Sequence, residues 1–343
     1  MDPKTCSFSA LPYDSEGPPY NAWGLYGPDD ELGRLNLITP QAIRRGRDEI
    51  KEGIAISLNM PMGMRAWTKH RDTFEHEIIY RGHGNDDHVA FNTQCSSQWD
   101  GFRHWPFQNF PRQGEHRFYG GMTMDDARDK SCVRNGTQST PAVQQVSCLI
   151  RYRAEPPCRV DYVKRPITSR AHLLDIPLFI SRNPSYGPFN PLRGENPIST
   201  TLLDLCAEAE RVVFEPGDIC IVRTGLTEAF LALSEEEYAE MLSKPRESAG
   251  VQQGEDMYRW HWEKGIAAVA SDTIGYESLP HQTEPSCHDV FLGAWGMPIG
   301  ELFDLRELSR QCEKIGRWSF FFTSMPLLVE GGIASPPNAQ AIL

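Results

Sequence analysis

Hydrophobic and polar positions along the chain predict short strands interleaved with amphipathic helices. Polar and apolar residues alternate through 54–60, and apolar runs bounded by turn-forming residues recur further along the chain. Alternation with a period of two is typical of a strand with one buried face, whereas short continuous apolar runs indicate strands inside a sheet. The pattern predicts strands in these segments: 54–60, 75–82, 170–179, two within 212–225, 266–273 and 318–332.

Capping signals predict where the helices begin. Thr39 can accept the free N–H groups of a first helical turn and Pro40 suits the first helical position, so we expect a helix from there to Gly53. Ser234 and Glu237 have the spacing of a capping box. Further helices are predicted at 200–211, 233–244, 256–265 and 304–316.

The organisation of the chain favours one α/β domain over residues 1–343, because it contains no internal repeat, no heptad pattern and no clean linker. Residues 1–38 are rich in Pro, Gly, Asn and Asp, so they are expected to form a loop-rich N-terminal arm. Residues 112–165 show weak periodicity and many turn formers, which predicts an irregular excursion.

Composition and charge argue against several classes of function. The 343 residues are 40% hydrophobic and 23% charged, as in soluble globular proteins, and the net charge of −12 argues against a nucleic-acid or anionic-membrane surface. No apolar run resembles a signal peptide or approaches the roughly 20 residues of a membrane helix. The nine cysteines are scattered and form no CxxC pair, so we expect reduced thiols in a cytoplasmic protein.

The stretch TQCSSQWDGFRHW, residues 93–105, concentrates candidate metal ligands. Gln94, Gln98, Asp100 and His104 all occupy even positions, so in a strand their side chains would share one face. Asp100 offers a carboxylate and His104 an imidazole, but the glutamines offer only amide oxygens, which suit hard cations weakly. Three interpretations stay open: a metal site, a site that has lost its metal, and a hydrogen-bonded polar turn between core tryptophans.

Two later stretches hold further candidates. In HDVFLGAWGMPIGELFDL, residues 288–305, His288 and Glu301 could converge on a site, although Glu301 could equally stabilise the start of a helix. Asp272 in ASDTIGYES, residues 270–278, suits either a pocket or a turn cap. The chain has no GxGxxG after a strand, no P-loop and no GxSxG, which counts against nucleotide binding and α/β-hydrolase chemistry.

Several stretches, spread in order over nearly the whole chain, carry a resemblance to one family. They are AWGLYGPDDELGRLNLITP (22–40), FNTQCSSQWDGFRHW (91–105), LLDIP (173–177), PGDICIVRTG (216–225), SDTIG (271–275), HDVFLGAWGMPIGELFDL (288–305) and GGIASPPNAQAI (331–342). With them the chain resembles the cyclase family of metal-dependent hydrolases, which includes kynurenine formamidase and isatin hydrolase, and most of all its long fungal and actinobacterial branch. The resemblance implies a mixed sheet with a β-barrel-like core surrounded by helices, a homo-oligomer, and a small cyclic or amide-bearing substrate.

The family signature H-x-G-T-H-x-D-x-x-x-H aligns with residues 94–104. Its aspartate and last histidine fall on Asp100 and His104, whereas its first two histidines, which are ligands in the metal enzymes, fall on Gln94 and Gln98. A later His and Glu of the family fall on His288 and Glu301.

The resemblance implies a role for each of these positions. Mn²⁺ or Zn²⁺ would be held by Gln94, Gln98, Asp100 and Glu301, and a proton would be moved by His104 or His288. Alternatively, the two glutamines would hold a substrate carbonyl, and the two carboxylates would be acid–base partners without a metal. Trp99 and Trp105 would form an aromatic wall for a planar substrate, with core packing as the alternative.

Residues 135–169 depart from the family, whose members carry a helix ahead of the LLDIP segment. They are either a lineage-specific insertion or a translated intron.

Three functions compete on this evidence. The first is a metal-dependent hydrolase of a C–N or C–O bond in a small cyclic amide or ester. The second is a metal-free lyase, isomerase or cyclase of small-molecule, including secondary, metabolism, with proton transfer by Asp100 and His104 or His288. The third is a non-catalytic protein that kept the fold and lost the chemistry.

Overall fold

The computed structural model describes residues 4–132, 134–136 and 165–343. The helices are α1 (Pro40–Arg47), α2 (Met124–Arg128), α3 (Ile176–Arg182), α4 (Thr200–Ala209), α5 (Leu226–Leu231), α6 (Glu235–Ser243), α7 (Glu255–Glu263) and α8 (Arg306–Ile315). The strands are β1 (Ala55–Ser57), β2 (Glu75–Tyr80), β3 (Asn85–Ala90), β4 (Gln98–Asp100), β5 (Ile167–Asp175), β6 (Ile219–Arg223), β7 (Ala268–Ser271), β8 (Ile299–Glu301), β9 (Ser319–Ser324), β10 (Ala334–Ser335) and β11 (Ala339–Ile342).

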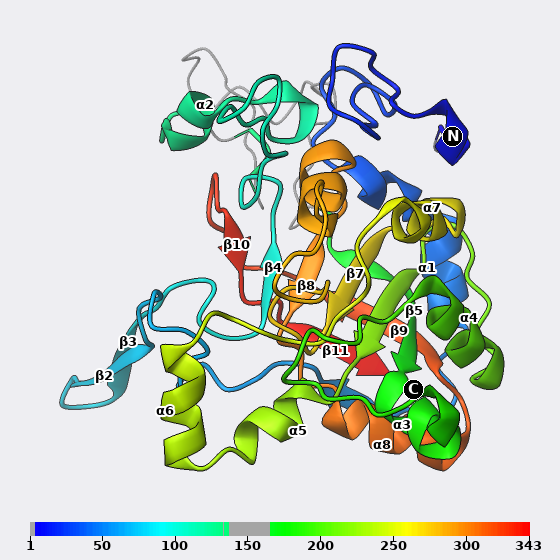
Figure 1. The fold of residues 1–343 in the computed structure, drawn as a ribbon. Coiled ribbons are helices and arrows are strands. Elements are labelled where there is room, and N and C mark those ends of the chain that lie inside the picture. Colours follow the sequence, from blue (N-terminus) through cyan, green and yellow to red (C-terminus); the bar gives the residue numbers. More distant parts are fainter. Residues whose placement is uncertain (1–3, 133, 137–164) are drawn as a thin grey trace.

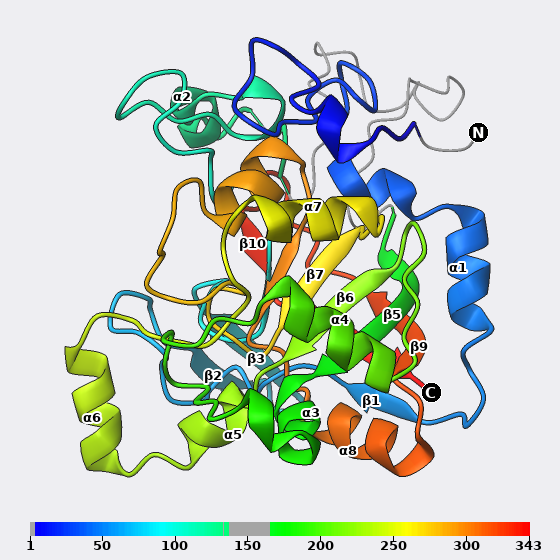
Figure 2. The ribbon, with the colours of Figure 1, turned by 45° about the vertical axis from the view of Figure 1, so that its right-hand side comes forward.

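A curled, mixed sheet of nine strands forms the centre of the molecule and is surrounded by helices (Figures 1 and 2). The strand order is β1-β11-β9-β5-β6-β7-β8-β4-β10. Strands β5 to β8 run parallel to one another, and β9 and β4 pair antiparallel at either side of that group. This half-barrel agrees with the α/β fold expected from the sequence.

The parallel strands are buried because helical crossovers connect and cover them. The segments IAAVASDT and DICIVRTG contribute fully buried β7 and almost fully buried β6, as expected for continuous apolar runs. Helix α1 packs across β5 and β9, and α3 and α4 pack against β5 and β6.

The structure confirms the predicted caps at the starts of two helices. The Thr39 side chain accepts the N–H of Ala42 and Pro40 begins α1, while Ser234 and Glu237 form the predicted capping box of α6. The predicted helices at 200–211, 256–265 and 304–316 correspond to α4, α7 and α8. Helix α1 ends at Arg47, however, before the predicted end at Gly53.

Three of the predicted strands either do not form or end earlier than the sequence predicts. Only β6 forms within 212–225, and β5 ends at Asp175, whose side chain caps α3. Strand β9 ends at Ser324, and the apolar residues after it, including Leu328, are exposed. Pro326 lacks the N–H that a strand needs for pairing, so apolar composition alone was misleading there.

A two-stranded hairpin, β2–β3, projects away from the central sheet (Figure 1). Of its residues only Ile79 is partly covered. The chain then enters the site stretch directly from β3.

Part of the predicted irregular excursion at 112–165 contains α2, and residues 137–164 of it lie outside the described residues, as does most of the segment 135–169. The described cysteines are all free thiols, whereas Cys148 and Cys158 lie outside the described residues. None of the described helices is both long enough and apolar enough to span a membrane.

Candidate functional site

The pairing of β4 with β8 builds the candidate site. The two strands run antiparallel, and their register places Gln98 directly opposite Glu301. Because side chains alternate along a strand, Gln98 and Asp100 share one face of β4 while Trp99 lies on the other. All of these side chains are buried.

Asp100, His288 and Glu301 converge, although they come from distant parts of the sequence. One potential ligand atom from each lies within 4.8 Å of the others. The Nε2 atom of His288 is 3.3 Å from Glu301 Oε1 and 3.7 Å from Asp100 Oδ2. Asp100 Oδ2 is fully buried and has no hydrogen-bond partner among the described residues.

The two glutamines use their amide N–H groups toward this cluster. Gln98 Nε2 donates to Glu301 Oε2 (2.6 Å) and to Gln94 Oε1 (3.0 Å), and Gln94 Nε2 donates to Asp100 Oδ1. Each carboxylate therefore has one oxygen satisfied by an amide, while its other oxygen faces His288. In this arrangement the glutamines position the carboxylates through their N–H groups, and Gln98 Oε1 is buried without a hydrogen-bond partner among the described residues.

Glu277 is a site residue that the sequence analysis missed. Its Oε2 is 3.0 Å from His288 Nδ1, and its Oε1 is 3.3 Å from Nε2 of the more exposed His281. Gly250 lies so close to the backbone of Glu277 that a Cβ atom there would be 2.3 Å from its carbonyl carbon. Nothing in the spacing of the sequence links Glu277 to His288; its place in segment 270–278, where the sequence analysis considered Asp272, was the only signal.

Electrostatics within the site favour a positive species at His288. Burial opposes charge there, but Glu277, Asp100 and Glu301 outweigh it and hold the pKa of His288 well above its usual value. Burial also opposes the charge of Asp100, yet the nearby His104 and His288 lower the pKa of that carboxyl.

Two of the remaining predicted residues, His104 and Trp105, lie at the site or beside it. His104 lies at the site: its Nε2 is 3.7 Å from Asp100 Oδ2, and its Nδ1 is 3.4 Å from Gln94 Nε2. Trp105 is half-buried and donates to Asp289 Oδ1 (2.9 Å), and its ring lies 5.7 Å from that of His288, centroid to centroid. It also lines a cavity of about 410 Å³.

Two expected candidates have structural surroundings instead. Trp99 is completely buried, packs on Phe303 and Phe322, and donates to Ser324 Oγ, so it belongs to the core and cannot form a substrate wall. Asp272 accepts the backbone N–H groups of residues 224–226, which is the turn-capping alternative.

The donor set fits a divalent cation. If His288 donates its Nδ1–H to Glu277, the neutral ring presents the lone pair of Nε2 toward two carboxylate oxygens, an arrangement that requires a proton or a metal ion between them. Two carboxylates and an imidazole suit Zn²⁺ or Mn²⁺, and a carboxylate behind the ligating imidazole is the usual outer partner of a metal-binding histidine. Asp100, His288 and Glu301 would be the ligands.

Comparison with known proteins agrees with this fold. Residues 54–278 match the sequence model of the family described as "Putative cyclase". A solved structure described as a novel cyclase superposes with a TM-score of 0.76 at 26% identity, covering 94% of this chain and 99% of the other. The chain belongs to the cyclase family.

Structures of isatin hydrolases share the fold at lower identity. Isatin hydrolase A from Labrenzia aggregata gives a TM-score of 0.53 at 11% identity, covering 84% of this chain and 93% of its own. The enzyme from Ralstonia solanacearum gives 0.52 at 13%, covering 86% and 92%. No curated protein sequence matches the chain.

Proposed function

We propose that the chain is a metal-dependent hydrolase that opens a C–N or C–O bond in a small cyclic amide or ester. The observation that carries the proposal is the cluster of Asp100, His288 and Glu301, with Glu277 behind the histidine. The fold shared with isatin hydrolases supports the same class of reaction.

Each residue has a defined task in this proposal. Asp100, Glu301 and His288 would hold the cation, which would polarise a carbonyl group and lower the pKa of water. His104 accepts a proton as water adds to the carbonyl carbon and returns one to the leaving nitrogen or oxygen as its bond to that carbon breaks. Trp105 forms a wall beside the substrate.

A second candidate is metal-free proton transfer in a lyase or isomerase. It is favoured by the amide N–H groups of Gln94 and Gln98, which already neutralise part of the carboxylate charge. In that case a protonated His288 would stand between the carboxylates, and His104 with Asp100 would move the proton.

The test combines metal content with turnover. The protein is dialysed against Mn²⁺ or Zn²⁺, its metal is measured by elemental mass spectrometry, and hydrolysis of a panel of small cyclic amides and esters, isatin included, is followed. We expect about one metal per chain, lost in Asp100→Asn and kept in Asp86→Asn, an exposed aspartate on the hairpin. Metal-free protein with no hydrolysis contradicts the proposal, and turnover that survives a chelator favours the second candidate.

We also propose that the chain forms a homo-oligomer through the β2–β3 hairpin. The register places Ile78, Tyr80 and Val89 on one face of it, and they are 69%, 76% and 44% exposed. An isolated two-stranded hairpin is marginally stable in water, so a second copy covering this face would stabilise it. Sedimentation of Ile78→Ser beside the unchanged protein tests this: a smaller species is expected, and an unchanged one contradicts it.

A further inference from the structure

A cavity of about 410 Å³ adjoins the site between segments 105–109 and 281–289. Two of its walls lie next to His288: the ring centroids of Trp105 and His281 are 5.7 and 6.4 Å from that of His288. A volume of this size is typical of small-molecule sites, which measure roughly 300–1,000 Å³. Its walls include Trp105, Gln108, His281, Thr283, Glu284 and Asp289.

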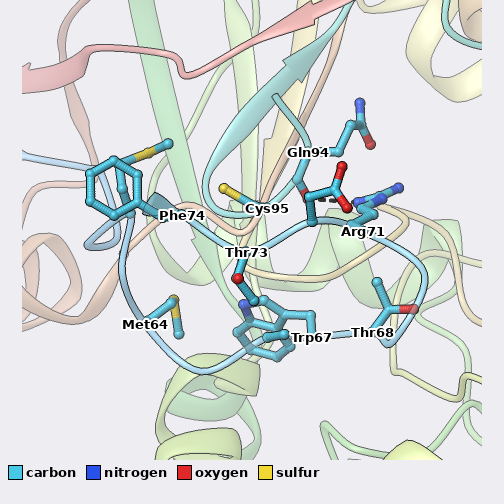
Figure 3. Close-up of a pocket in the computed structure, with 11 residues that line it drawn as sticks. Met64, Trp67, Thr68, Arg71, Thr73, Phe74, Gln94 and Cys95 are labelled. Carbon is cyan, nitrogen blue, oxygen red and sulfur yellow. Dashed lines mark hydrogen bonds between the residues drawn. The ribbon is translucent and has the colours of Figure 1, made fainter. Parts of the chain in front are cut away.

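The pocket between Gln94 and the loop that precedes β2 offers far less room beside the site. Figure 3 shows the side chains of Trp67, Arg71 and Gln94 around it, and its volume is only about 10 Å³. That is space for about one water molecule. An organic group that extends from the site therefore finds room in the cavity at Trp105 and not in this pocket.

Asp289 brings a buried negative charge to the wall of the large cavity. Its carboxylate accepts only neutral N–H groups: the indole of Trp105 (2.9 Å) and the backbone of Gln108 (3.2 Å) on Oδ1, and the backbone of Ser286 (2.7 Å) on Oδ2. No guanidinium or ammonium group of the described residues lies within ion-pairing distance of it. These hydrogen bonds hold the wall in place but leave its charge uncancelled.

The rest of the lining adds a second negative charge and no permanent positive one. Glu284 is exposed at the rim, and no Lys or Arg lines the cavity among the described residues. His281 does not reverse the balance, because its Nε2 lies 3.3 Å from the carboxylate of Glu277, which offsets any charge on the ring. The cavity therefore attracts cations and repels anions.

Trp105 gives the cavity an aromatic face. The indole is half-buried, and its hydrogen bond to Asp289 fixes the orientation of the ring. The face of an indole attracts a cation electrostatically, and aromatic faces are a common means of recognising ammonium groups. A carboxylate and an indole face in one cavity combine two independent attractions for the same chemical group.

We propose that this cavity binds an ammonium group carried by the substrate, while the bond to be broken lies at the Asp100–His288–Glu301 cluster. The inference rests on the proposed function in taking the bound cation to be part of the substrate. An anionic group would face Glu284 and Asp289 without a counter-charge. A neutral group would fit the cavity but gain no attraction from either carboxylate.

The test compares benzylamine, which is an ammonium ion at neutral pH, with benzyl alcohol, its neutral analogue of similar shape. Ligand-observed NMR titration of protein of known metal content gives both affinities, and their ratio is the ammonium preference. We expect a preference of about 10-fold. It should fall about 3-fold in Glu284→Gln and in Trp105→Leu, and Trp105→Phe should keep part of it because a phenyl face also attracts cations.

A charge placed in the cavity gives the sharper variant. Thr283 is exposed, so Thr283→Lys should be tolerated, and its ammonium group should abolish the preference for benzylamine. Glu236→Gln and Ala239→Lys make the same charge changes at exposed positions of α6 and should leave the preference unchanged.

Equal affinity for the two ligands overturns the inference. So does a preference that the cavity variants lower no more than the α6 variants do, because the attraction would then come from the net negative charge of the chain. Binding is measured without turnover. An ammonium preference located in the cavity of a protein that hydrolyses nothing supports the inference about the cavity and contradicts only the proposed function.

Discussion

Two buried carboxylate clusters on different strands of the sheet are satisfied in different ways. At the start of β6, Asp218 is bound by Arg170 at 2.7 Å, Arg45 at 3.1 Å and His172 at 3.0 Å, so both of its oxygens have charged partners. Burial opposes the charge of Asp218, but His172 and Arg170 overcome it and lower the pKa of the carboxyl.

At the candidate site, no guanidinium of the described residues lies within ion-pairing distance of Asp100 or Glu301, and Arg71 acts on their charges only from farther away. They receive amide N–H groups and one imidazole, and Asp100 Oδ2 receives no hydrogen bond at all. A buried carboxylate is retained at a cost unless it is paired, so the difference is informative. The first cluster is complete as folded, whereas the second leaves one buried carboxylate oxygen without a hydrogen bond.

Glu210 is a third buried carboxyl group, and its surroundings differ from those of both clusters. It accepts the backbone N–H of Asp175 with one oxygen, and its other oxygen has no hydrogen-bond partner among the described residues. Burial, with Asp175 adding to it, raises the pKa of Glu210 to about 8, so this carboxyl holds a proton at neutral pH. A buried carboxyl can therefore be matched by a guanidinium, by a proton, or by a cation from outside.

The largest loss of stability is expected from removing the charge of Asp218, whose two oxygens both have charged partners. Asp218→Asn leaves two guanidinium groups and His172 without their carboxylate and should lower the free energy of unfolding by about 3–5 kcal/mol. Urea denaturation measures it, with Asp86→Asn as an exposed control that should change stability by less than about 0.5 kcal/mol. Equal losses of stability in Asp218→Asn and Asp86→Asn would show that the Asp218 cluster does not stabilise the fold.

The dependence of stability on pH tests whether the Glu210 carboxyl is protonated. The folded pKa of Glu210, about 8, lies above the unfolded value of about 4.3, so its contribution to stability is complete below that lower value and is lost as the pH rises through 8. Between pH 6 and 8 the loss should be roughly 2 kcal/mol. Glu210→Gln should remove this part of the pH dependence in urea titrations; a profile identical to the unchanged protein would count against a bound proton.

The outer carboxylate of the site should affect metal affinity. Glu277→Gln keeps an acceptor for His288 but removes its charge, so Zn²⁺ affinity, measured by competition with a chelating dye, should fall about 10-fold. Glu263→Gln removes the same charge from an exposed helix position and should leave the affinity unchanged. Equal affinities in all three proteins would mean that Glu277 does not support the metal ligand.

The smallest effect on stability is expected at the site itself. Asp100→Asn in metal-free protein should change the free energy of unfolding by less than about 1 kcal/mol, because Oδ2 of this carboxylate has no hydrogen bond to lose. The measurement is the same urea titration used for Asp218→Asn. A loss as large as that of the Asp218 variant would show that the site is an ordinary structural cluster.

The sequence by itself determined the features that depend on near neighbours. Thr39 with Pro40, and Ser234 with Glu237, were sufficient to place two helix starts, because a cap involves residues within one turn. The even spacing of Gln98 and Asp100 placed both on one face of β4, because side chains alternate in any strand. The resemblance carried by stretches such as residues 91–105 indicated the family.

Only the tertiary structure decided which residues meet. The pairing of β4 with β8 sets Gln98 against Glu301 across more than 200 positions of sequence, and it made the glutamines donors to the carboxylates. Glu277 behind His288 and Arg71 beside Gln94 had no signal in the local pattern. Periodicity reports which face of an element is buried, but the partner of a buried polar atom is chosen by how distant elements pack.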